Sequence, residues 1–156
     1  MELTRTLLDE AIRALKTADH LTYVTYPLIH DIKLLVGVKE NLFFSLKKAM
    51  EALVQYEMLY KRIEPVKEDF NAQFEALRLI AGRYKLNETG IRLLKDLELF
   101  TKKRKRSQAE FIKKDKLILC SREFSAEVVS LDAVKKELAL TKELLGEINK
   151  VIVKGE

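Results

Sequence analysis

Apolar side chains recur between residues 38 and 64 with the spacing of one face of an α-helix. A first row advances by alternating steps of four and three residues, and a second row lies beside it and widens the apolar face. A helix that is apolar on two adjoining rows is usually central, with neighbours on more than one side. We therefore expect Leu46 and Leu53, in the middle of the first row, to be almost completely buried. The first row is Leu42, Leu46, Ala49, Leu53, Tyr56, Tyr60 and Ile63, and the second is Phe43, Met50, Val54 and Met58.

The central helix is expected to begin near Asp31, whose carboxylate can cap the first turn, and to end at Glu64, before Pro65. Gly37 lies inside this stretch, and a glycine costs about 1 kcal/mol in a helix interior relative to alanine. Two arrangements follow. The helix is continuous through Gly37, with a length of about 50 Å at 1.5 Å per residue, or it kinks or breaks there.

The segments on either side of the central helix also have helical periodicity. The first amphipathic helix covers residues 3–21, and the chain should leave the helical conformation at Tyr26, because a residue before proline disfavours it. A third helix is predicted over 67–84. A fourth begins after Asn87, a candidate N-cap, and ends in the cations at 102–106. The short link between these two helices predicts antiparallel neighbours.

The stretch after the fourth helix has a different pattern. Residues 107–110 match a capping box, which favours a short helical turn. The apolar runs at 116–120 and 127–129 are too short to assign by period, and we favour an extended or hairpin-like element for them. The last helix is predicted from Ser130, its N-cap, to a point before Gly155.

These elements predict an all-α fold. We expect a mainly antiparallel bundle of four or five helices, with a short extended or hairpin element around 117–129, in a single domain over residues 1–156. A hydrophobic content of 47% with 34% charged residues is that of a folded chain. There is no run of eighteen apolar residues, so no membrane span is expected. Glu2 is acidic and no long apolar segment follows it, so a secretion signal is not expected either. Cys120 is the one cysteine, which suits a reducing compartment. We therefore expect a cytoplasmic protein without a membrane span.

Several kinds of chemistry leave no signature in the chain. The five glycines are isolated from one another, so no glycine-rich phosphate-binding loop is expected. One cysteine and two histidines give no recognisable zinc spacing, and no Glu-x-x-His pair suggests a di-iron bundle. We expect no cofactor and no metal. A Ser–His–Asp triad is a spatial arrangement, so the sequence leaves that possibility open.

Basic residues are concentrated near the end of the fourth helix. Between Lys102 and Arg122 there are nine basic and two acidic residues, which gives this window a net charge of +7. The whole chain has a net charge of +5, so the remaining residues together carry −2. Phe111 and Phe124 lie in the same window, and aromatic side chains among cations are typical of single-stranded RNA binding. The alternative interpretation is a solvated helix end. The candidate nucleic-acid-binding residues are Lys102, Lys103, Arg104, Lys105, Arg106, Lys113, Lys114 and Lys116.

Two histidines lie on either side of the turn predicted around Pro27. His20 and His30, with Tyr23 and Tyr26 between them, could form a small polar site. We favour the simpler interpretation that these side chains satisfy backbone groups at helix ends, since helix ends need such partners in any case. Cys120, within an apolar run, is expected to be a buried small hydrophobic residue rather than a nucleophile.

The segments DHLTYVTYPLIHD (19–31) and KDKLILCS (114–121) resemble a group of short archaeal helical proteins. The order of helices is similar to that of the HEPN superfamily of nucleotide- and RNA-handling bundles. In catalytic members of that superfamily an arginine is followed, after four to six intervening residues, by a histidine, and the pair acts across a dimer. Arg13 and His20 have six residues between them, but they lie in the first helix, whereas the family motif lies late in the bundle.

The sequence therefore favours a non-catalytic binding or interaction protein that acts as a homodimer. The alternative is a HEPN-like RNA-binding module or ribonuclease that uses Arg13, His20 and the basic window at 102–122. The homodimer is expected because the helices carry more apolar surface than one small core needs.

Overall fold

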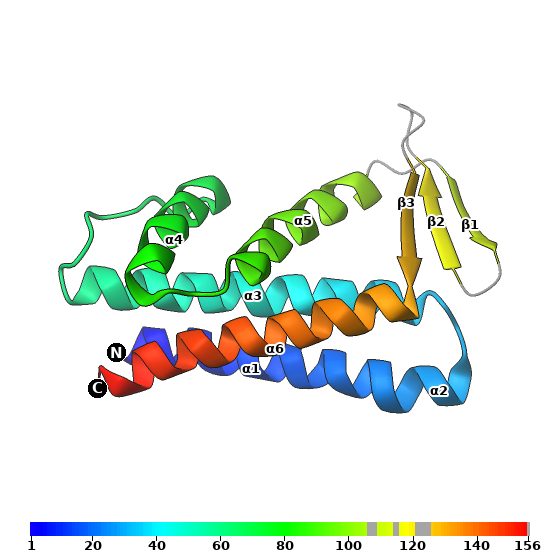
Figure 1. The fold of residues 1–156 in the computed structure, drawn as a ribbon, viewed down its shortest axis with the longest axis horizontal. Coiled ribbons are helices and arrows are strands. Elements are labelled where there is room, and N and C mark those ends of the chain that lie inside the picture. Colours follow the sequence, from blue (N-terminus) through cyan, green and yellow to red (C-terminus); the bar gives the residue numbers. More distant parts are fainter. Residues whose placement is uncertain (106–108, 114–115, 121–125, 156) are drawn as a thin grey trace.

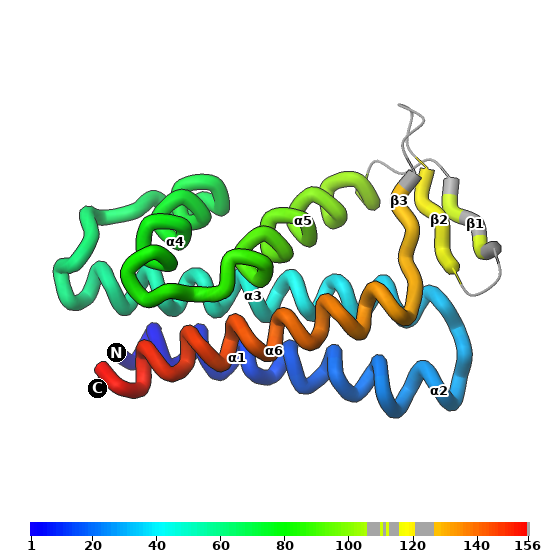
Figure 2. The backbone as a smooth tube through the Cα atoms, in the orientation of Figure 1, coloured from blue at the N-terminus to red at the C-terminus, as the bar shows by residue number. Residues whose placement is uncertain are grey.

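The computed structural model describes residues 1–105, 109–113, 116–120 and 126–155. Three long helices form the main layer of the molecule, α1 (Glu2–His20), α3 (Leu34–Leu59) and α6 (Leu131–Lys154). α3 packs against both of the others, and α1 also contacts α6 (Figure 1). α1 begins and α6 ends at the same end of the molecule (Figure 2).

α3 is the central helix that the sequence predicts. Leu46 is 1% exposed and Leu53 is fully buried, which confirms the expected buried face. α3 packs against α1, α4, α5 and α6, so its two apolar rows are covered from several sides. One connected cluster of buried apolar side chains includes residues from these helices and from the sheet.

The helix that begins with α1 does not end at Tyr26. It continues through a π-helical turn, η1 (Leu21–Thr25), into α2 (Tyr26–Ile29), and Tyr26 has helical backbone angles of −60° and −45°. In a regular α-helix the ring of Pro27 would clash with the carbonyl four residues earlier. The wider π turn at that position makes room for the ring, so the predicted break is wrong.

α3 begins later and ends earlier than predicted. Asp31 Oδ1 accepts a hydrogen bond from the Lys33 N–H at 3.0 Å, and the helix starts just after, at Leu34. The helix is continuous through Gly37, which decides between the two arrangements left open. It ends because Lys61 adopts the left-handed conformation, φ 56°, and the Arg62 N–H bonds to the Glu57 carbonyl at 2.9 Å.

Two shorter helices, α4 (Phe70–Tyr84) and α5 (Glu88–Lys105), lie over α3 (Figure 1). The Asp69 carboxylate caps α4 by accepting the Ala72 N–H at 2.9 Å, so α4 starts three residues after the predicted Lys67. Asn87 caps α5 as predicted, because its side-chain oxygen accepts the Gly90 N–H at 3.1 Å.

A small antiparallel sheet follows α5, with the order β1 (Ala109–Lys113), β2 (Lys116–Cys120) and β3 (Ala126–Ser130). β2 and β3 confirm the extended element predicted around 117–129. The short helical turn predicted over 107–110 is wrong where it can be tested, because Glu110 lies in β1 and pairs with Leu119. Ser107 and Gln108 lie outside the described residues.

The sheet is joined to α6 without a linker. The Ser130 hydroxyl accepts the Ala133 N–H at 3.3 Å, which confirms Ser130 as the N-cap. Val129 and Val134 are both almost completely buried on either side of this cap. The fold is thus an all-α bundle with a short sheet. The described residues form five helical segments when the consecutive elements α1, η1 and α2 are counted as one. Among the described residues, none of the helices has both the length and the apolar composition of a membrane span.

Candidate functional site

The structure places Arg13 and His20 on the surface of α1, and both side chains are exposed. Their sequence positions differ by seven, so they lie on the same side of α1, about 10 Å apart along its axis. The His20 Nδ1 atom is 3.4 Å from the hydroxyl of Thr25. A composite site that uses both residues stays a prediction.

Among the described residues, His20 forms no hydrogen bond or ring contact with the other residues of the possible polar site around Pro27. Tyr26 is buried, and its ring meets the edge of the His30 ring with 6.0 Å between centroids. Tyr23 is 51% exposed and lies under the ammonium groups of Lys135 and Lys142. His20, Tyr23 and Tyr26 lie within a stretch that is helical from Glu2 to Ile29, and these contacts are all with side chains, so the simpler interpretation as helix-end caps is not confirmed for them.

The basic window is largely paired with carboxylates where its side chains are described. The Lys102 ammonium is 3.1 Å from Glu98, and the Lys103 ammonium is 3.5 Å from Glu127. Arg104 bridges two carboxylates, at 2.9 Å from Glu40 and 3.4 Å from Glu110. Lys105 and Lys116 are exposed. The positive potential of this window is therefore smaller than its sequence charge suggests. The side chain of Lys113 is not described, and Arg106, Lys114 and Phe124 lie outside the described residues.

A hollow of about 550 Å³ adjoins this window. Phe44, which is 44% exposed, lies in its wall together with Lys105 at the end of α5. The hollow combines aromatic rings with cations, which is a feature of single-stranded nucleic-acid sites. Its lining consists of Glu40, Phe43, Phe44, Phe100, Thr101, Arg104, Lys105 and Glu110.

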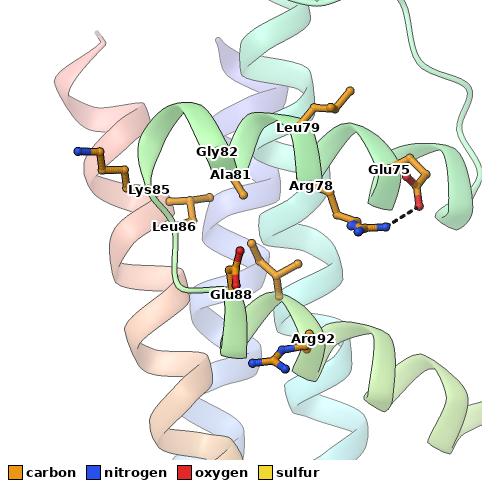
Figure 3. Close-up of a pocket in the computed structure, with 10 residues that line it drawn as sticks. Glu75, Arg78, Leu79, Ala81, Gly82, Lys85, Leu86, Glu88 and Arg92 are labelled. Atoms are coloured by element: carbon orange, nitrogen blue, oxygen red, sulfur yellow. Dashed lines mark hydrogen bonds and ion pairs between the residues drawn. The ribbon is translucent and has the colours of Figure 1, made fainter.

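A second and larger surface groove, of about 630 Å³, lies between α4 and α5 (Figure 3). Its apolar floor is formed by Ala81, Leu86 and Ile91, all of which are buried. Leu79 projects from α4 at the rim and is 81% exposed. The charged lining residues are Glu75, Arg78, Lys85, Glu88 and Arg92. This groove is the candidate functional site, and we call it the α4–α5 groove.

The turn between the two helices fixes the closed end of the α4–α5 groove. Lys85 adopts the left-handed conformation, φ 53°, and the Leu86 N–H donates to the Ala81 carbonyl at 3.0 Å. The Asn87 backbone and side-chain N–H groups donate to Glu147 and Glu143 of α6, at 3.0 and 2.9 Å. The turn is therefore held on α6 while the two helices diverge from it (Figure 3).

The beginning of α5 approaches α6 very closely at Gly90. A Cβ atom at this position would lie 3.0 Å from the Leu144 Cβ atom. Gly90 thus allows the beginning of α5 to lie close to α6. Gly82 is different, because a Cβ atom there would meet no atom within 4 Å. Packing does not require this glycine, although it costs about 1 kcal/mol in a helix interior relative to alanine.

A buried carboxylate holds the C-terminal half of α4 on α3. Glu57 has no exposed side-chain surface and pairs with Arg62 at 3.0 Å and Arg83 at 2.8 Å. Hydrogen bonds with Tyr56 and then Glu57 raise the pKa of the Arg62 guanidinium, so it stays a cation. Burial, and next its hydrogen bond with Glu57, raises the pKa of the Tyr84 phenol. The wall of the α4–α5 groove is fixed by this network.

The α4–α5 groove combines apolar and charged side chains. Its lining contains aliphatic side chains, three cations and two carboxylates. Among the described residues, no group of three or more His, Cys, Asp or Glu side chains could hold a metal ion. Comparison with known proteins adds no assignment, because no family model, curated protein or solved structure matches the chain.

The groove is absent from the sequence-based candidates, although one local signal for it exists. An apolar row recurs at helical spacing along α4, and Leu79 lies off this row, next to Arg78. The row is Phe70, Phe74, Leu77, Ala81 and Tyr84. A large apolar residue on the polar side of an amphipathic helix can mark a contact surface. The contribution of α5 to the groove depends on tertiary packing and has no such signal.

Proposed function

We propose that this protein is a non-catalytic binding protein that holds a peptide segment of a partner protein in the α4–α5 groove. One observation carries the proposal. Leu79 is 81% exposed at the rim of a groove of about 630 Å³ with a buried apolar floor. Binding sites combine an apolar floor with a few placed polar groups, as this groove does.

The dimensions of the α4–α5 groove support a peptide ligand. Its α4 wall extends from Glu75 to Lys85, which is about 15 Å at 1.5 Å per residue. This length matches about three turns of a helix or four to five residues of an extended chain. Gly82 lies within this wall and leaves open space that a bound segment can enter.

The experiment is selection from a displayed library of random peptides against three immobilised proteins. The wild type is compared with Gly82→Leu, which fills the groove, and with Gly146→Leu, a matched control on α6 where a Cβ atom also meets nothing within 4 Å. We expect peptides that are retained by the wild type and by Gly146→Leu and lost from Gly82→Leu. Equal retention by all three proteins, or no retention by any, would contradict the proposal.

A second candidate function is RNA binding or cleavage by a HEPN-like module. The hollow beside α5 favours it, because Phe44 and Lys105 place an exposed ring near an exposed cation. A ribonuclease that uses Arg13 and His20 loses activity in His20→Ala while its fold is unchanged by circular dichroism. If wild-type cleavage of a single-stranded RNA exceeds that of His20→Ala, the catalytic alternative replaces the non-catalytic one.

A homodimer and a cytoplasmic location belong to the same proposal. Self-association is supported by the apolar end formed by α2, where Leu28 is 80% and Ile29 61% exposed. Large apolar side chains grouped on a surface are characteristic of contact sites. The location rests on the use of a single cysteine, Cys120, which is half-buried in β2.

A further inference from the structure

We infer that the segment held in the α4–α5 groove is an amphipathic helix with acidic residues beside its apolar face. This inference rests on the proposed function and specifies its ligand. Three features of the groove carry it. They are the positions of its cations, the backbone of its walls and the residue types of its lining.

The cations of the groove define the charge of the ligand. Arg78, Lys85 and Arg92 surround the apolar floor, and the Arg78 and Arg92 side chains lie on opposite walls (Figure 3). Arg78 is 3.5 Å from Glu75, in a pair whose two side chains are both more than 60% exposed. Neither Lys85 nor Arg92 forms an ion pair within the described part of the chain. A ligand with carboxylates on both sides of its apolar face therefore complements the rim.

The backbone of the groove walls favours a helical ligand over a strand. Both walls are α-helices, whose N–H and C=O groups are bonded within each helix except in the last turn of α4 and the first turn of α5. An extended peptide needs an open strand edge to pair its backbone groups, and the α4–α5 groove has none along its helical walls. A helix satisfies its own backbone and presents only side chains to the groove.

The lining of the groove also disfavours a proline-rich ligand. Polyproline segments dock between aromatic rings, and no aromatic residue lines the α4–α5 groove. The aliphatic side chains Leu79, Leu86 and Ile91 suit leucine-type anchors instead. On a helix such anchors repeat at positions i, i+3 or i+4, and i+7, which fits a wall about 15 Å long.

The test is a selection from a displayed library of helical peptides. Each peptide carries a fixed leucine stripe at i, i+3 and i+7, with Glu, Lys, Ser or Pro randomised at the other positions. We expect the wild-type protein to retain peptides enriched in Glu and depleted in Pro, and Gly82→Leu to lose them. The affinity of a retained peptide should fall as the salt concentration rises.

A second experiment reverses the charge of two arginines in the groove. The double variant Arg78→Glu with Arg92→Glu should weaken a retained acidic peptide at least about tenfold and should select Lys-rich peptides instead. The matched control is Lys16→Glu, an exposed residue on α1. Thermal unfolding of each variant verifies that the fold is intact.

The outcomes separate this inference from the proposed function. If retention depends on Gly82 but the retained peptides are basic, neutral or proline-containing, the inference is overturned while the groove remains a binding site. If retention does not depend on Gly82, both fail. If charge reversal leaves the affinity and the selected charge unchanged, the inference is overturned as well.

Discussion

Arg83 and Glu57 form an ion pair that joins an exposed helix face to the core, with 2.8 Å between Arg83 Nη1 and Glu57 Oε1. The Glu57 side chain has no exposed surface, whereas that of Arg83 is 47% exposed. A carboxylate buried in this way is stable only with partners, and Arg62 supplies a second one at 3.0 Å. The pair fixes α4 against α3 and so determines the position of one groove wall.

Replacing Glu57 with Gln should lower the free energy of unfolding by about 1–3 kcal/mol, since it removes charge-assisted hydrogen bonds from a buried site. The matched control is Glu75→Gln, whose pair with Arg78 is exposed on both sides and should contribute about 0–1 kcal/mol. Urea unfolding monitored by circular dichroism measures both values. Equal effects of the two substitutions would contradict a structural role for the buried pair.

The raised pKa of Tyr84 predicts a dependence of stability on alkaline pH. The ordinary value for a tyrosine is 10.0, and the folded state holds the proton more tightly than the unfolded state. This contribution is fully present below pH 10 and is lost as the pH rises through the folded-state pKa. Above pH 10 the melting temperature of the wild type should therefore fall more steeply than that of Tyr84→Phe. Parallel curves for the two proteins would show that Tyr84 is not the group responsible.

The core of the bundle gives a prediction about truncated leucines. Leu46→Ala and Leu53→Ala should each cost about 2–5 kcal/mol, because both side chains are almost fully buried in the central helix. The comparison is Leu79→Ala, at 81% exposure, which should change stability by less than about 0.5 kcal/mol. Chemical denaturation separates the two groups. A loss at Leu79 as large as that at Leu46 would mean that the α4–α5 groove is closed in solution.

Substitutions at Gly82 should change the stability of the protein and its binding of peptides independently. Gly82→Ala should stabilise the protein by up to about 1 kcal/mol, since alanine is the better helix former and no atom obstructs its Cβ. Gly146→Ala should do the same on α6. Only Gly82→Leu should also weaken peptide binding. Destabilisation by Gly82→Ala would indicate a packing role for this position that the structure does not contain.

The exposed apolar end formed by α2 predicts self-association. Light scattering at micromolar concentration should give about twice the monomer mass of 18.1 kDa. The double variant Leu28→Ser with Ile29→Ser should give the monomer mass, because it removes the two most exposed apolar side chains at this end. A wild-type mass near 18.1 kDa across this range would remove the homodimer.

Sequence periodicity predicted the helices well because each buries one regular face. The first and last helices, the α4 face and the caps at Asn87 and Ser130 are all local patterns of three to four residues. The continuation of the helix through Pro27 was not predictable in this way. A π turn changes the geometry that a proline meets, and nothing in the sequence marks the π turn itself.

The net charge of the basic window predicted its surface potential less well, because carboxylates that are distant in the sequence pair with its cations. Glu40 is on α3, and it pairs with Arg104 of α5 only through the tertiary fold. The α4–α5 groove has the same origin. Its cations are spread over 15 residues, from Arg78 to Arg92, and come from two helices and the turn between them. Such arrangements follow from packing rather than from a motif.

Chemical-shift mapping locates a bound peptide on the protein directly. The ¹⁵N-labelled wild-type protein is titrated with an acidic helical peptide retained in the selection, and the amide shifts are assigned to elements. We expect the largest changes at 75–85, along α4 and its C-cap, and at 88–92 of α5, and we expect them to disappear in Gly82→Leu. Changes centred on α1, α2 or the β-sheet, or unchanged binding in Gly82→Leu, would contradict binding in the α4–α5 groove.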